Sequence, residues 1–203
     1  MIMKIKSLLA AFALSTLLCF PVQADDDTCH EIGISYGVEP NTFWLDMYTD
    51  LIQMEFGETL DGEKYVGPIG LEYYYHTSPL IGVGAVAVFA SNHQNGFRNN
   101  VQSSHTTRTY FSFMPSVKFN WLRKHNWGLY SKVAAGGTYI RFNKEDCDDN
   151  GKKTGENDIV NDLMFNFQAT LIGIEAGGDH VRGFVELGVG EQGVALAGVR
   201  CKF

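Results

Sequence analysis

The end of the chain, residues 183–203, alternates between two kinds of side chain with a period of two. A glycine-flanked pair, Gly190-Glu191-Gln192-Gly193, divides this stretch into two short segments, as a tight turn does. In the second segment one row consists of Ala195, Ala197, Val199, Cys201 and Phe203, and the other of Val194, Leu196, Gly198, Arg200 and Lys202. Successive side chains of a β-strand point to opposite faces, so the pattern predicts a hairpin with one apolar face and one face that becomes basic.

The same alternation recurs upstream and is clearest between residues 110 and 121. The apolar row there is Phe111, Phe113, Val117, Phe119 and Trp121, and the facing row is Tyr110, Ser112, Met114, Ser116, Lys118 and Asn120. Alternating segments also occupy 32–38, 65–76, 129–139 and 165–171. Residues 80–89 are apolar in both rows, so the pattern predicts a strand there without fixing its phase. Together with the terminal hairpin, these segments predict eight strands.

The N-terminus has a different composition. Lys4 and Lys6 precede an apolar run from Leu8 to Phe20, and Val22-Gln23-Ala24 follows as a cleavage sequence. The run is shorter than the roughly 20 residues that a membrane-spanning helix needs, and this order of features is typical of a secretory signal peptide. We therefore expect residues 1–24 to be a cleaved signal peptide and 25–203 to form one exported domain. Loss of two lysines makes the mature chain more acidic than the −7 of the whole chain, which argues against a nucleic-acid partner.

The eight segments have the features of strands that cross a membrane. Their connections alternate between long loops at 39–64, 91–106 and 143–161 and short turns, as in outer-membrane barrels. Aromatic residues lie at predicted strand ends, where interfacial girdles form: Tyr65, Tyr75, Trp121, Trp127, Tyr139 and Phe203. In lipid no backbone group can stay unpaired, so the sheet must close. The sequence predicts an all-β fold, an eight-stranded antiparallel up-and-down transmembrane β-barrel.

The predicted inner row carries charges of both signs: Glu72, Lys118, Lys132, Glu186, Arg200 and Lys202. The interior of an eight-stranded barrel is just wide enough for side chains to fill it, so we expect a plugged lumen rather than an open pore. Interior glycines would make room for the long charged chains: Gly33, Gly37, Gly70, Gly136 and Gly188. For Arg200 and Lys202, a position at the water-exposed rim is an equal alternative.

The first long loop contains apolar residues at helical rather than strand-like spacing: Phe43, Trp44, Met47, Leu51 and Met54. Asn41 or Thr42 precedes them as a candidate N-cap, so we predict a short helix over 43–56. An apolar face in an exposed loop needs a partner. We expect this helix to cover the barrel mouth, with the outer leaflet or an exposed contact patch as alternatives.

Three stretches carry a resemblance: Gly-Ile-Ser-Tyr-Gly at 33–37, Gly-Pro-Ile-Gly-Leu-Glu-Tyr at 67–73 and the final strand that ends on Phe203. Over residues 29–203 the chain resembles the small eight-stranded outer-membrane barrels of the OmpA/OmpX type. The resemblance implies an integral protein of the outer membrane, with outer-membrane lipids and lipopolysaccharide as partners. It also implies recognition of the Phe203 end by the barrel-insertion machinery. Cys201, two residues earlier on the same face, departs from the aromatic or aliphatic residue usual there.

Two other patterns invite a chemical interpretation. Asp146 to Gly151 fits the opening D-x-D-x-N-G of a calcium loop, but position twelve is Asn157 instead of Glu, so an acidic solvated segment at 146–158 is favoured over calcium binding. Cys29 and Cys201 belong to the first and last strands, which are neighbours in a closed barrel. A Cys29–Cys201 disulfide and free thiols, including Cys147, are both compatible with the sequence.

No catalytic, cofactor-binding or metal-ligating residue is predicted. His93 and His105 share a polar stretch with Ser91, Ser103 and Ser104, but nothing in the sequence places them beside an acid. We expect a non-enzymatic structural or surface-interaction role in the outer membrane. The alternatives are a lipid A-modifying, deacylase-like enzyme with a Ser–His–acid cluster at the rim, and a soluble lipocalin-like barrel with its apolar face inside.

Overall fold

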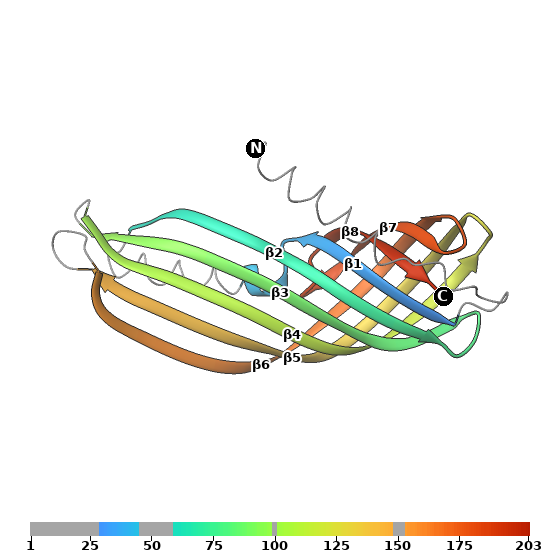
Figure 1. Cartoon of the computed structure of the whole chain (residues 1–203), viewed down its shortest axis with the longest axis horizontal. Coiled ribbons are helices and arrows are strands. Elements are labelled where there is room, and N and C mark those ends of the chain that lie inside the picture. Colours follow the sequence, from blue (N-terminus) through green and yellow to red (C-terminus); the bar gives the residue numbers. More distant parts are fainter. Residues whose placement is uncertain (1–28, 45–58, 99–100, 148–152) are drawn as a thin grey trace.

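The computed structural model describes residues 29–44, 59–98, 101–147 and 153–203. Eight antiparallel strands form a closed barrel in sequence order, and β1 completes the sheet by pairing with β8 (Figure 1). The strands are β1 His30–Val38, β2 Thr59–His76, β3 Ile81–Arg98, β4 Val101–Arg123, β5 Trp127–Cys147, β6 Lys153–Gly177, β7 Val181–Gly190 and β8 Ala195–Lys202. The all-β, eight-stranded up-and-down architecture predicted from the alternation is confirmed, and it is the fold that the resemblance implied.

The outer face of the barrel is apolar and the inner face is polar. In β4 the large residues Phe111, Phe113, Phe119 and Trp121 are exposed, whereas Ser112, Ser116, Lys118 and Asn120 are buried. β7 shows the same division, with Val185 and Leu187 outside and Phe184 and Glu186 inside. A soluble ligand-binding barrel has the opposite arrangement, so the lipocalin-like alternative does not fit these faces.

The phase of β3, which the sequence left open, is settled by burial. Val86, Val88 and Ala90 face the interior, and Val83 and Phe89 face outward. Val86 and Val88 pack against Tyr74, Met114 and Ala134 in an apolar layer that lies inside the barrel. Alternation had already placed Met114 in the inner row, but the β3 members Val86 and Val88 could not be assigned to a face from the sequence.

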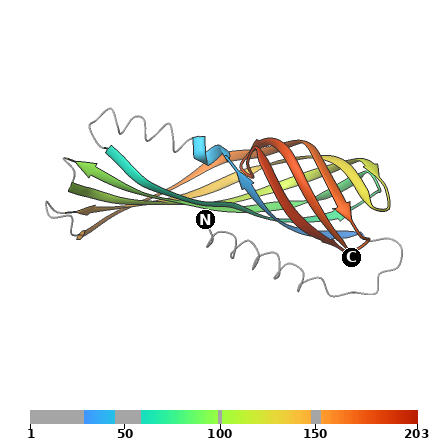
Figure 2. The same cartoon turned by 90° about the horizontal axis from the view of Figure 1, so that it is seen from above.

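The strands differ in length, and the barrel is therefore taller on one side. β2 to β6 have 18 to 25 residues, whereas β1, β7 and β8 have 8 to 10. The pairing of β1 with β2 stops at Tyr36–Ile69, and the pairing of β7 with β6 stops at Gly190–Gln168. Beyond these points the five strands continue as an open sheet (Figures 1 and 2). We call this sheet the extension; it comprises residues 59–66, 91–98, 101–109, 141–147 and 153–167.

The extension corrects the predicted loops at 91–106 and 143–161. The ladder between β3 and β4 runs up to Arg98–Val101, and that between β5 and β6 runs up to Cys147–Lys153. Polar residues were taken as a sign of irregular loops, but a strand with water on its faces needs no apolar row. The opposite end of the barrel, which we call the turn end, has the short connections near residues 78, 125 and 179.

The connection after β1 begins as predicted. Residues 41–44 are helical, and the amide of Phe43 donates to the carbonyl of Pro40 at 3.0 Å. The remainder of the expected helix, together with the expected signal peptide, lies outside the described residues. Among the described residues no helix combines the length and apolarity needed to cross a bilayer.

One girdle residue does not lie where it was expected. A register shift between Val66 and Ile69 inserts an extra residue into β2 and reverses its alternation. Val66 is therefore exposed, and Tyr65 turns away from the outer row and contacts the ring of Phe43. The other predicted girdle residues, Tyr75, Trp121, Trp127, Tyr139 and Phe203, are exposed.

Candidate functional site

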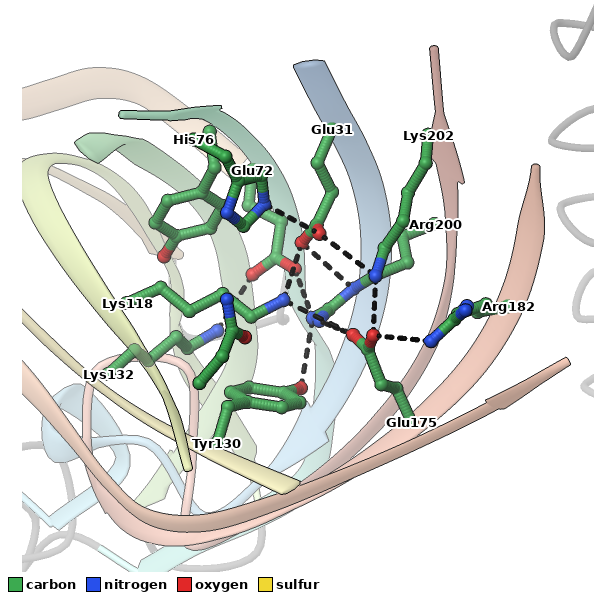
Figure 3. Close-up of polar contacts among 12 residues, drawn as sticks. Glu31, Glu72, His76, Lys118, Tyr130, Lys132, Glu175, Arg182, Arg200 and Lys202 are labelled. Atoms are coloured by element: carbon green, nitrogen blue, oxygen red, sulfur yellow. Dashed lines mark hydrogen bonds and ion pairs between the residues drawn. The ribbon is translucent and has the colours of Figure 1, made fainter. Parts of the chain in front are cut away.

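Charged side chains fill the lumen toward the turn end (Figure 3). We call them the lumen cluster: Glu31, Glu72, Glu175 and Glu186 with Lys118, Lys132, Arg182, Arg200, Lys202 and His76. Each of these residues is at most 8% exposed. Buried charges are tolerated when each has an opposite partner and its hydrogen bonds are made, and here five Lys and Arg side chains face four carboxylates.

Arg200 of β8 lies at the centre of the lumen cluster. Its Nη2 donates to Glu72 Oε1 at 2.7 Å and its Nη1 donates to Glu175 Oε2 at 2.8 Å. Its Nε lies 3.3 Å from Glu31 Oε1. The guanidinium also packs over the ring of Phe184, with 3.9 Å between Cζ and the ring centroid. One planar group thus joins carboxylates that come from β1, β2 and β6.

Lys118 of β4 and Lys132 of β5 pair with Glu31, Glu72 and Glu186. Lys132 Nζ lies 2.7 Å from Glu72 Oε2 and 2.8 Å from Glu186 Oε2. Lys118 Nζ lies 2.8 Å from Glu31 Oε1 and 4.2 Å from the ring centroid of Tyr130. The Tyr130 hydroxyl donates to Glu186 Oε1 at 2.7 Å, so an aromatic side chain links the two ion-paired groups.

Arg182 and Lys202 connect the lumen cluster to the turn end. Arg182 Nη1 donates to Glu175 Oε1 at 3.0 Å, and its other nitrogens donate to the carbonyls of Gly178 and His125. Lys202 Nζ donates to the same Glu175 oxygen. The lumen is therefore closed at this end by side chains that are themselves tied to the turns.

All six charged residues predicted for the inner row are buried in the lumen. For Arg200 and Lys202 this removes the rim alternative, because their exposed fractions are 0% and 5%. Gly33 makes room as predicted, since a Cβ there would lie 2.9 Å from Glu72 Cγ and 3.3 Å from Arg200 Cβ. Gly136 and Gly188 do not serve this purpose, because a Cβ on either would meet the backbone of the neighbouring strand.

Three members of the lumen cluster were not predicted from the sequence: Glu31, Glu175 and Arg182. Glu31 precedes the first residue assigned to a strand, although it continues the inner row of Gly33 and Ser35. Glu175 was hidden by a register shift in β6: Thr170 is buried, Leu171 and Ile172 are both exposed, and Glu175 is buried again. Strict alternation from Thr170 would have placed Glu175 outside.

A second polar site lies near the mouth of the barrel, in the turn between β7 and β8. Glu191 is fully buried there and accepts hydrogen bonds from Ser112 at 3.1 Å, Asn166 at 2.8 Å and Thr42 at 3.3 Å. These partners come from β4, β6 and the helical residues after β1. No described cation acts on this carboxyl, and burial raises its pKa above the usual value of a glutamate.

The histidines and serines once considered for catalysis do not form a triad among the described residues. Ser91 Oγ lies 3.4 Å from His93 Nε2, but the other ring nitrogen of His93 contacts the hydroxyl of Thr107 at 3.0 Å rather than a carboxylate. Ser104 is buried on the opposite, inner face of the sheet. The acid that would orient the histidine of a lipid A deacylase-like enzyme is not present at this position.

The calcium-like segment and the cysteines are also placed. Asp146 and Cys147 end β5 and Lys153 begins β6, so residues 148–152 in the middle of the calcium-like segment lie outside the described residues, and the expected acidic solvated segment stays a prediction. The described residues contain no group of three or more potential His, Cys, Asp or Glu metal ligands. Cys29 has a free thiol, so the Cys29–Cys201 disulfide is not formed.

One of the solved structures that resemble the chain is a bacterial protein. It is described as the attachment invasion locus protein Ail of Yersinia pestis; it is 13% identical, with a TM-score of 0.40, and the match covers 86% of this chain and 96% of that one. No protein-family model and no curated protein matches the chain. The fold described above therefore rests on the chain's own strand order and register: it is a closed, eight-stranded antiparallel barrel with an apolar exterior and a charged interior.

Proposed function

We propose that the protein is an integral barrel of the bacterial outer membrane with a structural or surface-interaction role. The observation that carries this proposal is the apolar exterior around a charged interior. Leu171 of β6 is 73% exposed and Phe113 of β4 is 55% exposed; exposure of such large apolar side chains is unfavourable in water and favourable in lipid. β1 and β7, with 9 and 10 residues, have the length that a tilted strand needs to cross a bilayer.

The filled lumen supports a role other than transport. Lys118, Lys132 and Arg200 are fully buried and each lies against two or more carboxylates. A solute would have to break several of these contacts at once. We infer that the lumen cluster stabilises the barrel and that the interaction surface lies on the extension.

Among the described residues nothing pairs with the outer edges of β2 and β6 in the extension, and such edges suit recognition of an extended polypeptide. Part of the β6 edge is blocked: Asp162 Oδ1 accepts from the amide of Leu163 at 2.8 Å, and Asn166 Oδ1 accepts from the amide of Phe167 at 2.9 Å. The Phe167 carbonyl points toward the β7–β8 turn, and residues 163 and 167 have the same parity, so both amides face the open edge. We propose that partners pair with residues 153–161 of β6, or with residues 59–66 of β2.

The lipid-facing wall gives the further partners that we propose: outer-membrane phospholipid and lipopolysaccharide around the belt. The Phe203 end, proposed as the contact of the insertion machinery, is held by β1. Its amide and carbonyl pair with His30 at 2.9 Å each, and its ring stacks on the His30 ring with centroids 5.6 Å apart.

Cell fractionation combined with a heat-modifiability gel tests the location. We expect the protein in the outer-membrane fraction, with a band that shifts between unboiled and boiled samples because the closed barrel resists detergent. A periplasmic product without a shift would overturn the membrane proposal.

Labelling on intact cells tests which end is outside. In a background with the native cysteines replaced by serine, Asn161→Cys lies on the exposed face of the extension and His125→Cys lies in a turn. A membrane-impermeant maleimide should label position 161 on intact cells and position 125 only after lysis. The reverse result would place the extension in the periplasm and exclude a surface role.

A further inference from the structure

Two histidines form a stacked pair on the outer face of the extension. His93 of β3 and His105 of β4 have ring centroids 6.4 Å apart and ring planes at 12°. The register places His93 opposite Thr107 and His105 opposite Asn95, so the two histidines are diagonal neighbours on the same face. Both side chains are partly exposed, and they lie beyond the aromatic residues Phe89 and Phe111 that end the apolar belt.

Each ring is oriented by a hydrogen bond at Nδ1 to a residue on the opposite strand. His105 Nδ1 lies 2.7 Å from Asn95 Oδ1, which can only accept, so Nδ1 carries the proton and Nε2 keeps its lone pair. His93 Nδ1 lies 3.0 Å from Thr107 Oγ1, which fits the same tautomer. Metal-bound histidines are held in this way, with one ring nitrogen donating to a neighbouring oxygen and the other free to ligate.

We propose that His93 and His105 bind a divalent transition-metal ion of the Zn²⁺ or Cu²⁺ class through their Nε2 atoms. Imidazole nitrogen suits these ions, which bind it at about 2.0–2.1 Å, so the two nitrogens must approach to within about 4 Å of each other. Metal binding requires the partly exposed rings to tilt toward each other, which would break the long 3.4 Å contact of His93 Nε2 with Ser91 Oγ. Water completes the coordination of this two-residue site.

Two charged residues are register partners of the histidines and should influence how tightly the pair binds a cation. Glu145 of β5 is the register partner of His105, and Lys64 of β2 is the register partner of His93, so one position of each sign flanks the pair. Among the other described histidines, His76 is buried against Glu31 and His125 lies at the turn end beside Asp179. His30 and His180 have other contacts: His30 Nδ1 lies 2.8 Å from the Tyr73 hydroxyl and His180 Nδ1 lies 3.3 Å from the Lys202 carbonyl.

Titration of the untagged mature chain in detergent micelles tests the site, with Cu²⁺ as the probe and Zn²⁺ as a competitor. We expect one saturable site per chain with an affinity in the micromolar range, and a Cu²⁺ EPR spectrum that shows nitrogen ligation. His93→Gln and His105→Gln should each weaken binding by about tenfold or more. Thr107→Val, which keeps both ligands but removes the acceptor of His93 Nδ1, should weaken it by about tenfold as well.

His125→Gln and Cys29→Ser serve as matched controls, and a heat-shift gel verifies that every variant is folded. Both controls should bind Cu²⁺ like the native chain. The proposal is overturned if the native chain shows no saturable binding, if His93→Gln and His105→Gln bind unchanged, or if only Cys29→Ser abolishes binding.

Discussion

Arg200 shows how one residue can organise a barrel interior. It comes from the strand before the C-terminus, yet it reaches carboxylates on β1, β2 and β6, which lie around most of the barrel. A lysine at this position would bring one ammonium group, whereas the guanidinium offers separate donors in fixed directions. Arg200 of β8 also pairs with Glu31 of β1, so it links the last strand to the first where the two meet.

Replacing Arg200 should therefore destabilise the barrel strongly. Arg200→Ala leaves Glu31, Glu72 and Glu175 in the lumen with one cation fewer, and removal of one member of a buried ion pair typically costs about 3–5 kcal/mol. Urea unfolding in lipid vesicles, monitored by tryptophan fluorescence, measures the loss. Arg200→Lys keeps the charge and should lose less; equal losses for the two variants would show that charge is unimportant there.

Glu191 should make the stability of the barrel depend on pH, because its buried carboxyl has no described cation beside it. Its folded pKa is raised above the unfolded value of about 4.3, so the stabilisation present at low pH is lost as the pH rises through the folded pKa. Glu191→Gln removes the charge and keeps one acceptor oxygen, which can face Asn166 while the amide nitrogen donates to the hydroxyl of Ser112. We expect this variant to gain on the native protein as the pH increases from 4 to 8, by about 1.4 kcal/mol for each unit by which the pKa is raised.

The measurement is the difference in unfolding free energy between the two proteins at each pH, which cancels the titration of groups that they share. Glu39→Gln removes a charge at an exposed site and is the control. A difference that stays constant from pH 4 to 8 would contradict a raised pKa for Glu191 in the folded state.

At the scale of the strand, register shifts decide which side chains reach the lumen. β6 carries one extra residue between Thr170 and Gly173, relative to both β5 and β7. Because of this bulge, Glu175 faces Arg200 instead of lipid. The bulge is thus as necessary to the lumen cluster as the charges themselves.

Deleting Leu171 should remove the bulge and rotate residues 172–177 by one position. Glu175 would then face lipid and the lumen would lose its main turn-end carboxylate, so we expect no heat-modifiable band. Leu171→Ala keeps the length of the strand and removes only a lipid-facing side chain, and it should insert and shift normally. A shifted band from the deletion variant would show that β6 tolerates either phase.

The same bulges mark the limit of what could be predicted from the sequence. Where alternation is uninterrupted, as in β4 and β7, the inner and outer residues were predicted correctly, and six members of the lumen cluster followed from it. Tyr65 and Glu175 were not placed, because an inserted residue reverses the phase of the alternation. In β2 the insertion lies at Gly67-Pro68, a signal in the sequence that was not used, whereas Leu171 and Ile172 at the β6 insertion give no such signal. Residues 91–106 and 143–161 were taken for loops because a strand with water on its outer face has no apolar row.

At the scale of the whole molecule, the lumen cluster separates this barrel from a pore. Each fully buried cation in it contacts more than one carboxylate, and the apolar layer around Val86 and Met114 fills the wall beside it, since Val86 is the register partner of Glu72. We expect purified protein in planar bilayers to show no steady ion conductance. Stable, voltage-independent channels from a preparation that is fully heat-modifiable would contradict the filled lumen.

Because the strands differ in length, the barrel rises to different heights on its two sides. β1, β7 and β8 end near the mouth, while β2 to β6 continue beyond it, so the barrel has a low rim on one side and a standing wall on the other (Figure 2). A large particle that approaches over the low rim meets the mouth and the Glu191 turn, whereas one that approaches from the other side meets the His93 and His105 face. Rotation of the barrel about the membrane normal therefore decides which of two unlike surfaces a neighbour encounters. Two copies held side by side in a fixed orientation would each turn only one of these two surfaces toward the other copy.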